Sequence, residues 1–149
     1  MSLTTPEDTT AHGEGPAESE LLTIRDLFAQ IGIGDAVRVG DEFVVELPAA
    51  PHVVNHRGGI QGGLIATLID VVAGIHALES CPADVGVVTS DMNIRYLAPI
   101  TAGRARASSR IIHSGRRSVV VQVDVHGTDP ERLAVVATAN FAKTAKRSG

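Results

Sequence analysis

Apolar and polar residues alternate along the second half of the chain, and this alternation predicts β-strands. In the clearest case Val119, Val121, Val123 and Val125 lie on one side of an extended segment, while the opposite side is mainly polar. A period of two with one apolar side is typical of an antiparallel strand with one buried face. The sequence predicts four such strands, over residues 85–97, 104–113, 118–127 and 132–143.

Two helices and a hairpin are predicted before these strands. A helical period from Glu20 to Ile31 ends at Gly32, and two short runs around Gly40-Asp41 predict a hairpin. From Gly62 to Ser80 apolar residues fall on every side, which is typical of a buried helix. We therefore expect an α+β fold, with a curved antiparallel sheet of five or six strands wrapped around one long central helix.

The length of the chain indicates one domain. With 149 residues and 44% hydrophobic residues, there is enough apolar surface for one core. Residues 1–19 are rich in Thr, Glu, Pro, Gly and Ser and predict a disordered N-terminal tail. The single domain is expected over residues 20–144, with a short C-terminal tail over 145–149.

Composition and charge limit the expected partners. A net charge of −4 and 3% aromatic residues without tryptophan argue against nucleic acid. The sequence predicts neither a signal peptide nor a membrane span, and its only cysteine, Cys81, forms no internal disulfide, so a cytoplasmic location is expected. Residues 55–149 carry eleven basic and seven acidic side chains, so this part of the chain is the candidate for binding an anion.

The segment from Asn55 to Gly63 carries the clearest chemical signal, because a glycine-rich loop opens directly into the central helix. The unpaired amides of a helix start favour a negative charge or a polarised carbonyl oxygen, which suits an oxyanion hole. The glycine spacing fits neither a dinucleotide fingerprint nor a phosphate loop. A second interpretation is that these glycines only form a tight turn against the sheet.

Asp70 is the only charged residue of the central helix before Glu79. A carboxylate among apolar side chains is costly to bury, and desolvation would make it a stronger base, which suits a general base or a nucleophile. If the helix start borders a cleft, Asp70 and the loop amides can face the same cavity. The alternative is a structural carboxylate that caps a loop or pairs with an arginine.

The other residues that could serve in a site are explained equally well by a structural role. The six histidines lack metal-ligand spacing, so no metal is predicted, and His76 is expected in the core. Cys81 is also expected to be structural. Three arginines of one strand are expected to pair across strands with Asp124 or to face solvent, namely Arg104, Arg106 and Arg110. Arg116 and Arg117 follow a glycine turn and are the better candidates for phosphate contacts.

These motifs together resemble a known family. The pattern Asn55-x-x-Gly58-x-x-Gln61-Gly62-Gly63, followed by Ala66-Thr67-Leu68-Ile69-Asp70 and by Val88-Thr89-Ser90-Asp91-Met92-Asn93-Ile94-x-Tyr96-Leu97-x-Pro99, resembles the hotdog-fold acyl-CoA thioesterases of the phenylacetate-degradation (PaaI-like) branch. The resemblance covers about residues 27–143.

The resemblance implies a role for each motif residue. It implies a homodimer assembling to a homotetramer, in which the Gly62 amide polarises the thioester carbonyl, Asn55 positions the reacting groups, and Asp70 of the facing subunit is base or nucleophile. The resemblance also implies that the Thr89 hydroxyl assists the attacking water. The implied substrate-binding residues are Gly63, His56, Arg116 and Arg117, with the two arginines near the CoA phosphates. Gln61 departs from the family, which usually has histidine there, and glutamine cannot shuttle a proton at neutral pH.

The expected function is hydrolysis of an acyl-CoA thioester, with no cofactor because CoA is part of the substrate. The alternative is a non-catalytic acyl-CoA-binding or scaffolding protein, which Gln61 motivates. An enoyl-CoA hydratase would need a further acid and base pair. The acyl group is not readable, because Leu64, Leu68, Val71 and Ile75 are explained equally by a pocket or by core packing.

Overall fold

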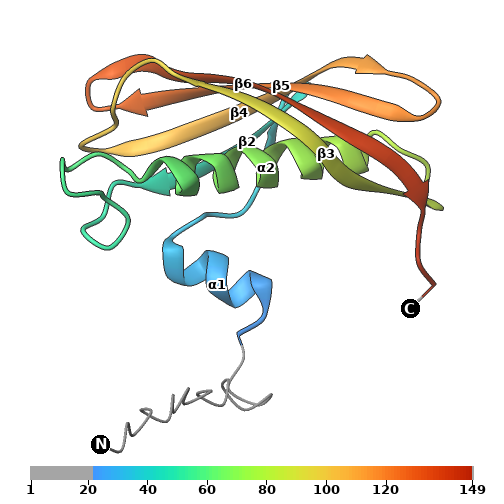
Figure 1. Cartoon of the computed structure of the whole chain (residues 1–149), viewed down its shortest axis with the longest axis horizontal. Helices are drawn as coiled ribbons and strands as arrows, with labels where there is room; N and C mark the ends of the chain where they lie inside the picture. The colour runs from blue at the N-terminus through green and yellow to red at the C-terminus, as the bar shows by residue number, and fades with distance from the viewer. Residues whose placement is uncertain (1–21, 149) are drawn as a thin grey trace, which may run out of the picture.

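A computed structural model of the chain describes residues 22–148. One curved antiparallel sheet of six strands lies against a single long helix, which is the expected hotdog architecture (Figure 1). The elements in chain order are α1 (Ile24–Ile31), β1 (Val37–Val39), β2 (Glu42–Pro48), α2 (Gly62–Glu79), β3 (Val85–Tyr96), β4 (Arg104–Ser114), β5 (Ser118–Thr128) and β6 (Glu131–Ala145). The predicted bounds of the hairpin, the central helix and the four later strands are confirmed to within a few residues.

The strand order β1-β2-β4-β5-β6-β3 places β3 at an edge of the sheet. This twelve-residue strand pairs with β6 on one side only, in a register that brings Thr89 opposite Phe141 and Tyr96 opposite Val135. The register shifts between Thr89 and Asp91, which marks a bulge. A long edge strand presents unpaired backbone groups on its other side.

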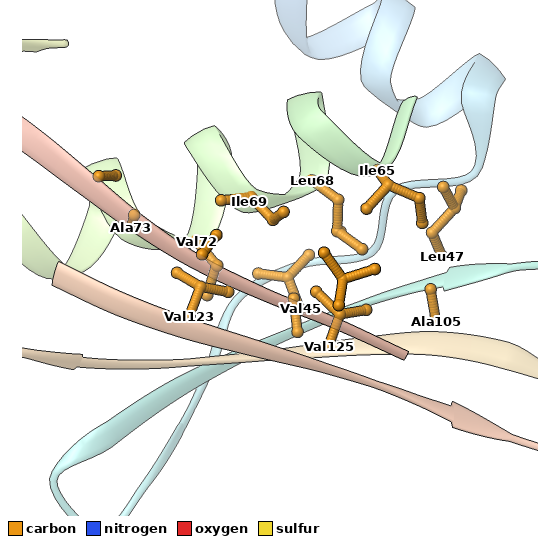
Figure 2. Close-up of a cluster of buried hydrophobic side chains, with 14 of the residues drawn as sticks. Val45, Leu47, Ile65, Leu68, Ile69, Val72, Ala73, Ala105, Val123 and Val125 are labelled. Atoms are coloured by element: carbon orange, nitrogen blue, oxygen red, sulfur yellow. The ribbon is translucent and has the colours of Figure 1, made fainter. Parts of the chain in front are cut away.

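The core lies between α2 and the concave face of the sheet. Figure 2 shows Leu68, Ile69 and Val72 pointing from the helix toward Val123 and Val125 of the sheet. All four alternating valines of β5 are fully buried, as their period predicts. Burial of each such side chain contributes about 1.5–3 kcal/mol, so this layer fixes the helix on the sheet.

The opposite face of α2 differs from the prediction, which expected burial on all sides. Val71 and Ile75 are only half-buried and Leu78 is exposed, because no strand covers this face. By length and hydropathy alone α2 would also qualify as a membrane span, but strands β2 to β6 pack against it as the core helix of the sheet. Within residues 22–148 only α1 lies over this apolar face, and it leaves the face partly exposed.

Helix α1 lies on the side of α2 away from the sheet (Figure 1). It begins at Ile24, later than predicted, because Thr23 and Asp26 form a reciprocal capping box at its start. It ends at the predicted Gly32, in the left-handed conformation that glycine favours (φ 105°). No residue of α1 is buried, and His52 Nε2 donates to the carbonyls of Gln30 and Ile31 at its C-terminal end.

The predicted tails lie at the limits of the described chain. The expected disordered tail, residues 1–19, lies outside the described residues. Strand β6 ends at Ala145, one residue beyond the expected end of the domain, and residues 146–148 form no regular secondary structure.

Candidate active site

The loop before α2 is held by hydrogen bonds around Asn55. The Asn55 amide donates to the Gly59 carbonyl at 2.7 Å, and the Asn55 side-chain Oδ1 accepts from the Arg57 amide at 2.9 Å. Gly58 has a φ of 84°, which explains its glycine. The turn interpretation is therefore correct for this part of the loop, and the side chains of Asn55 and of its neighbour His56 remain exposed.

Gln61 caps the start of α2. Its side-chain Oε1 accepts from the Leu64 amide at 2.9 Å. A Cβ at position 63 would lie 2.9 Å from this oxygen, so Gly63 allows the glutamine side chain to fold over the helix start. The structure thus shows a capping role for the exposed Gln61 side chain, and this role was not predicted from the sequence.

The first two amides of α2 are available to a ligand. In residues 22–148 the amides of Gly62 and Gly63 donate to no other group of the chain. Gly62 borders a cavity of about 340 Å³, which is also lined by Asn55, Gly59, Ile60, Ile65, Tyr96, Leu97, Ala98, Pro99, Ile100 and Val135. Asn55 and the helix start therefore share one cavity, as an oxyanion hole requires.

Tyr96 holds the helix start from the neighbouring strand. Its hydroxyl donates to the Gly62 carbonyl at 2.6 Å, and its ring lies 3.5 Å from the position of a Cβ on Gly62. Burial raises the pKa of the Tyr96 hydroxyl, which remains a donor at neutral pH. Sequence reasoning did not predict this contact, because the two residues lie 34 positions apart.

Asp70 lies on the uncovered side of α2 and pairs with Thr89. The Thr89 hydroxyl donates to Asp70 Oδ1 at 2.7 Å, and both residues line a second cavity of about 580 Å³. Within residues 22–148 Asp70 forms no ion pair, since the two ion pairs found there join Arg104 to Glu46 and Arg106 to Glu131. The arrangement is that of a carboxylate oriented by one hydroxyl and open to a groove.

The two halves of the candidate site do not meet within one chain. Gly62 and Asp70 are eight residues apart on α2, which is about 12 Å along the helix axis, and they border different cavities. Asp70 and the loop amides of one chain therefore do not face the same cavity, contrary to what the sequence suggested. A second chain would be needed to bring an Asp70 to the Gly62 amide.

A basic turn lies at the end of the sheet nearer to Asp70. Arg116 and Arg117 are exposed in the turn between β4 and β5, and the Arg117 carbonyl accepts from the Lys143 amide at 2.8 Å. Lys143 Nζ also donates to Ser114 Oγ at 3.4 Å, which adds a third cation that sequence reasoning missed. The register partner of Lys143 is Val87, two residues before Thr89 in β3, so this cluster lies near the end of the sheet at which Thr89 contacts Asp70.

The core histidine is confirmed. His76 is 8% exposed, and its Nδ1 donates to Ser109 Oγ at 2.8 Å, while Ser109 in turn donates to the Phe43 carbonyl. Burial lowers the pKa of His76. In the described part of the chain no group of three histidine, cysteine or acidic side chains has the geometry of a metal site.

The strand arginines pair across the sheet, but not with the predicted residue. Arg104 binds Glu46 at 2.8 Å, Arg106 binds Glu131, and Arg110 donates to Gln122 at 3.1 Å. Asp124 accepts only from Gln122, at 3.4 Å. The guanidinium groups bind Glu46 of the adjacent strand β2, Glu131 at the start of β6 and Gln122 of the adjacent strand β5, so Asp124 was the wrong partner. The shared face and its exposure to solvent were predicted correctly.

Comparison with known families agrees with this architecture. Residues 58–134 match the family model described as thioesterase superfamily. The chain belongs to this superfamily, and the match includes the helix start, Asp70 and Thr89. The hotdog fold and the class of thioester hydrolases are thereby supported together.

Individual relatives carry related names. The 1,4-dihydroxy-2-naphthoyl-CoA hydrolase of Listeria monocytogenes is 28% identical over 104 residues, covering 70% of this chain and 84% of the relative. An acyl-coenzyme A thioesterase of Rattus norvegicus is 33% identical over 94 residues, which span 62% of this chain and only 39% of the rat protein. A Bacillus halodurans protein solved with CoA has a TM-score of 0.71 and 30% identity, covering 79% of this chain and 75% of its own.

Proposed function

We propose that the protein hydrolyses acyl-CoA thioesters to a free carboxylic acid and CoA. The observation that carries this proposal is the pair of unpaired amides at Gly62 and Gly63, together with an oriented carboxylate at Asp70. The CoA bound to the Bacillus halodurans protein and the CoA substrate named for the Listeria monocytogenes relative support the choice of thioester. Hydrolysis of a thioester needs only water as co-reactant, so no cofactor is proposed.

The proposed chemistry assigns one step to each group. Asp70 takes a proton from water, whose oxygen attacks the thioester carbonyl carbon, and the Gly62 amide stabilises the resulting oxyanion. When the carbon–sulfur bond breaks, Asp70 returns the proton to the CoA sulfur. Direct attack by the Asp70 carboxylate is the variant in which an acyl anhydride forms first and water then hydrolyses it. Thr89 holds Asp70 in place and can hold the water.

The proposed active unit is a homodimer with each site at the subunit interface. The separation of about 12 Å between Gly62 and Asp70 along one helix supports a site that takes Asp70 from the partner. The edge strand β3 offers unpaired backbone groups to a second copy, and the apolar outer face of α2 needs a covering surface. Association of two such dimers into a homotetramer is part of the same proposal.

The phosphates of CoA are assigned to the basic turn. Arg116 and Arg117 lie near the end of the sheet at which Thr89 contacts Asp70, and the Lys143 amide donates to the Arg117 carbonyl. Guanidinium groups bind phosphate with two parallel hydrogen bonds. Asn55 borders the cavity at the helix start and Gly63 is the second residue of α2, so both would contact the part of the substrate next to the thioester. The exposed His56, which follows Asn55 in the loop, is assigned to the same part of the substrate.

Membership of the PaaI-like branch and a cytoplasmic location remain proposals that rest on the motif from Asn55 to Asp70 and on the composition. The second candidate function is a non-catalytic acyl-CoA-binding protein. The observation that favours it is Gln61, whose side chain caps α2 and cannot shuttle a proton at neutral pH.

Thiol release separates the two functions. A panel of acetyl-CoA, octanoyl-CoA, palmitoyl-CoA and benzoyl-CoA is incubated with the protein, and free CoA is measured with a thiol reagent. Release that depends on enzyme concentration and is lost in Asp70→Asn supports hydrolysis. Measurable CoA binding by calorimetry without any release supports the binding protein and refutes the hydrolase.

A further inference from the structure

The cavity that contains Asp70 and Thr89 lies between the outer face of α2 and helix α1. Its volume of about 580 Å³ is within the range of small-molecule sites. From α2 the cavity is lined by Val71, Gly74, Ile75 and Leu78. Helix α1 contributes Phe28 together with Ile24, Arg25 and Ala29, and the sheet contributes Val87 and Phe141. An apolar chamber thus adjoins the carboxylate that we assign to the reaction.

Gly74 leaves room in this chamber that the fold does not require. Glycine in the interior of a helix is less favourable than alanine. A Cβ at position 74 would lie 3.5 Å from Phe141 Cε1, an ordinary van der Waals contact, so packing against the sheet does not demand glycine. The missing side chain instead deepens the cavity beside Asp70, one turn further along α2.

The opposite wall comes from α1. Phe28 is the residue of this helix that lines the cavity with an aromatic ring, and it is half-buried, while its neighbour Leu27 is 42% exposed and lies outside the cavity. His52 at the C-terminal end of α1 and Gly32 fix where the helix stands. The helix therefore places the Phe28 ring in the wall of the chamber that Gly74 also lines.

The charges in the cavity disfavour an anionic ligand group. The charged residues that line it are Arg25, Asp35 and Asp70, so negative charges outnumber positive ones. A ligand carboxylate here would be repelled by Asp70 next to the reacting carbon. An uncharged apolar group is the matching occupant.

We propose, resting on the thioesterase function above, that this cavity binds the acyl group, that the substrates are thioesters of uncharged apolar acids, and that Gly74 and Phe28 set the accepted acyl length. Each methylene covered by the cavity raises kcat/KM by about fourfold. Wild-type protein then prefers octanoyl-CoA over acetyl-CoA and over succinyl-CoA.

The test compares kcat/KM for these three thioesters in four proteins. Gly74→Val fills the chamber and lowers kcat/KM for octanoyl-CoA by about tenfold, while acetyl-CoA changes less than about twofold. Phe28→Ala removes a wall and lowers the octanoyl-CoA value similarly. Leu27→Ala, on the same helix but outside the cavity, is the matched control and keeps the wild-type profile.

The outcomes distinguish this inference from the proposed function. Light scattering and thermal unfolding confirm that each variant has the fold and assembly of the wild type, and Gly74→Ala replaces Gly74→Val if the larger side chain prevents folding. Equal losses for acetyl-CoA and octanoyl-CoA, or a wild-type preference for succinyl-CoA, would overturn the acyl assignment alone. No thiol release by the wild type from any thioester would overturn the function and this assignment together.

Discussion

The Thr89 hydroxyl donates a 2.7 Å hydrogen bond to Asp70 Oδ1 across the gap between strand β3 and helix α2. One oxygen of the carboxylate is thereby fixed, and the other is free to face the second cavity. Because Thr89 stands at a bulge at the sheet edge, the pair lies where a second copy of β3 would approach. The chemistry and the proposed interface therefore coincide.

The first prediction concerns this pair. Asp70→Asn removes the proton acceptor and lowers kcat by at least about 100-fold, because general base catalysis contributes that much or more. Thr89→Val removes one hydrogen bond to a charged group and lowers kcat by about tenfold, whereas Thr89→Ser keeps the hydroxyl and serves as control. Steady-state thiol release measures all three, and wild-type turnover in Asp70→Asn would refute the catalytic role.

The Gly62 amide can be removed without removing a side chain. Gly62 is the first residue of α2, where proline is well tolerated, and Gln61 before it is extended (φ −60°, ψ 132°), as a following proline requires. Gly62→Pro therefore deletes one donor of the oxyanion hole and lowers kcat by about 100-fold or more.

Gly62→Ala is the matched control, because it keeps the amide and its Cβ meets Tyr96 at an ordinary 3.5 Å. Thermal unfolding is expected to be near wild type in both variants. If Gly62→Pro folds and retains full turnover, the amide takes no part in the reaction.

Gln61 allows stability and activity to be separated. Gln61→Ala removes the side-chain acceptor for the Leu64 amide and lowers the free energy of unfolding by about 1 kcal/mol. Gln61→Ser supplies another capping oxygen and restores this stability. If Gln61 also contacts substrate through Nε2, Gln61→Ser has low turnover in the thiol assay although its urea unfolding midpoint recovers. Recovery of both turnover and the unfolding midpoint would limit Gln61 to capping.

His76 predicts how stability depends on pH. Burial lowers the pKa of its imidazole below the usual 6.5, so below that pH the unfolded chain binds a proton that the folded chain does not. The stability contributed by neutral His76 is complete above pH 6.5 and is lost as the pH falls through the lowered pKa. Urea unfolding at pH 7.5, 6.5 and 5.5 should show a smaller decline in His76→Gln than in wild type, and identical declines would contradict the assignment.

The sheet and the central helix were predictable because their signals are local. Four valines at a period of two mark β5, and a mainly apolar run in which Asp70 is the only charged residue before Glu79 marks α2. The start of α1 was also readable, since Thr23 and Asp26 have the spacing of a capping box, but the apolar period placed it too early.

The candidate site residues could be named from the sequence, but their arrangement in space could not be predicted. The contact of Tyr96 with Gly62 joins residues far apart in sequence, and the Gln61 cap depends on a side-chain conformation that Gly63 permits. The apolar residues on all sides of α2 indicated burial on every side, yet within residues 22–148 the strands cover only one face and α1 covers the other in part. A sequence pattern records that a face is apolar and does not record which surface covers it.

We propose that Asp70 of one subunit acts with the Gly62 amide of the other. The most direct measurement mixes the two inactive variants, Gly62→Pro and Asp70→Asn, under conditions that exchange subunits, and follows thiol release. In a symmetric dimer, random pairing puts one intact site in half of the dimers, so we predict recovery of about a quarter of wild-type turnover. Heterodimers that form, as shown by mass spectrometry of differently tagged chains, but regain no activity would contradict a shared site.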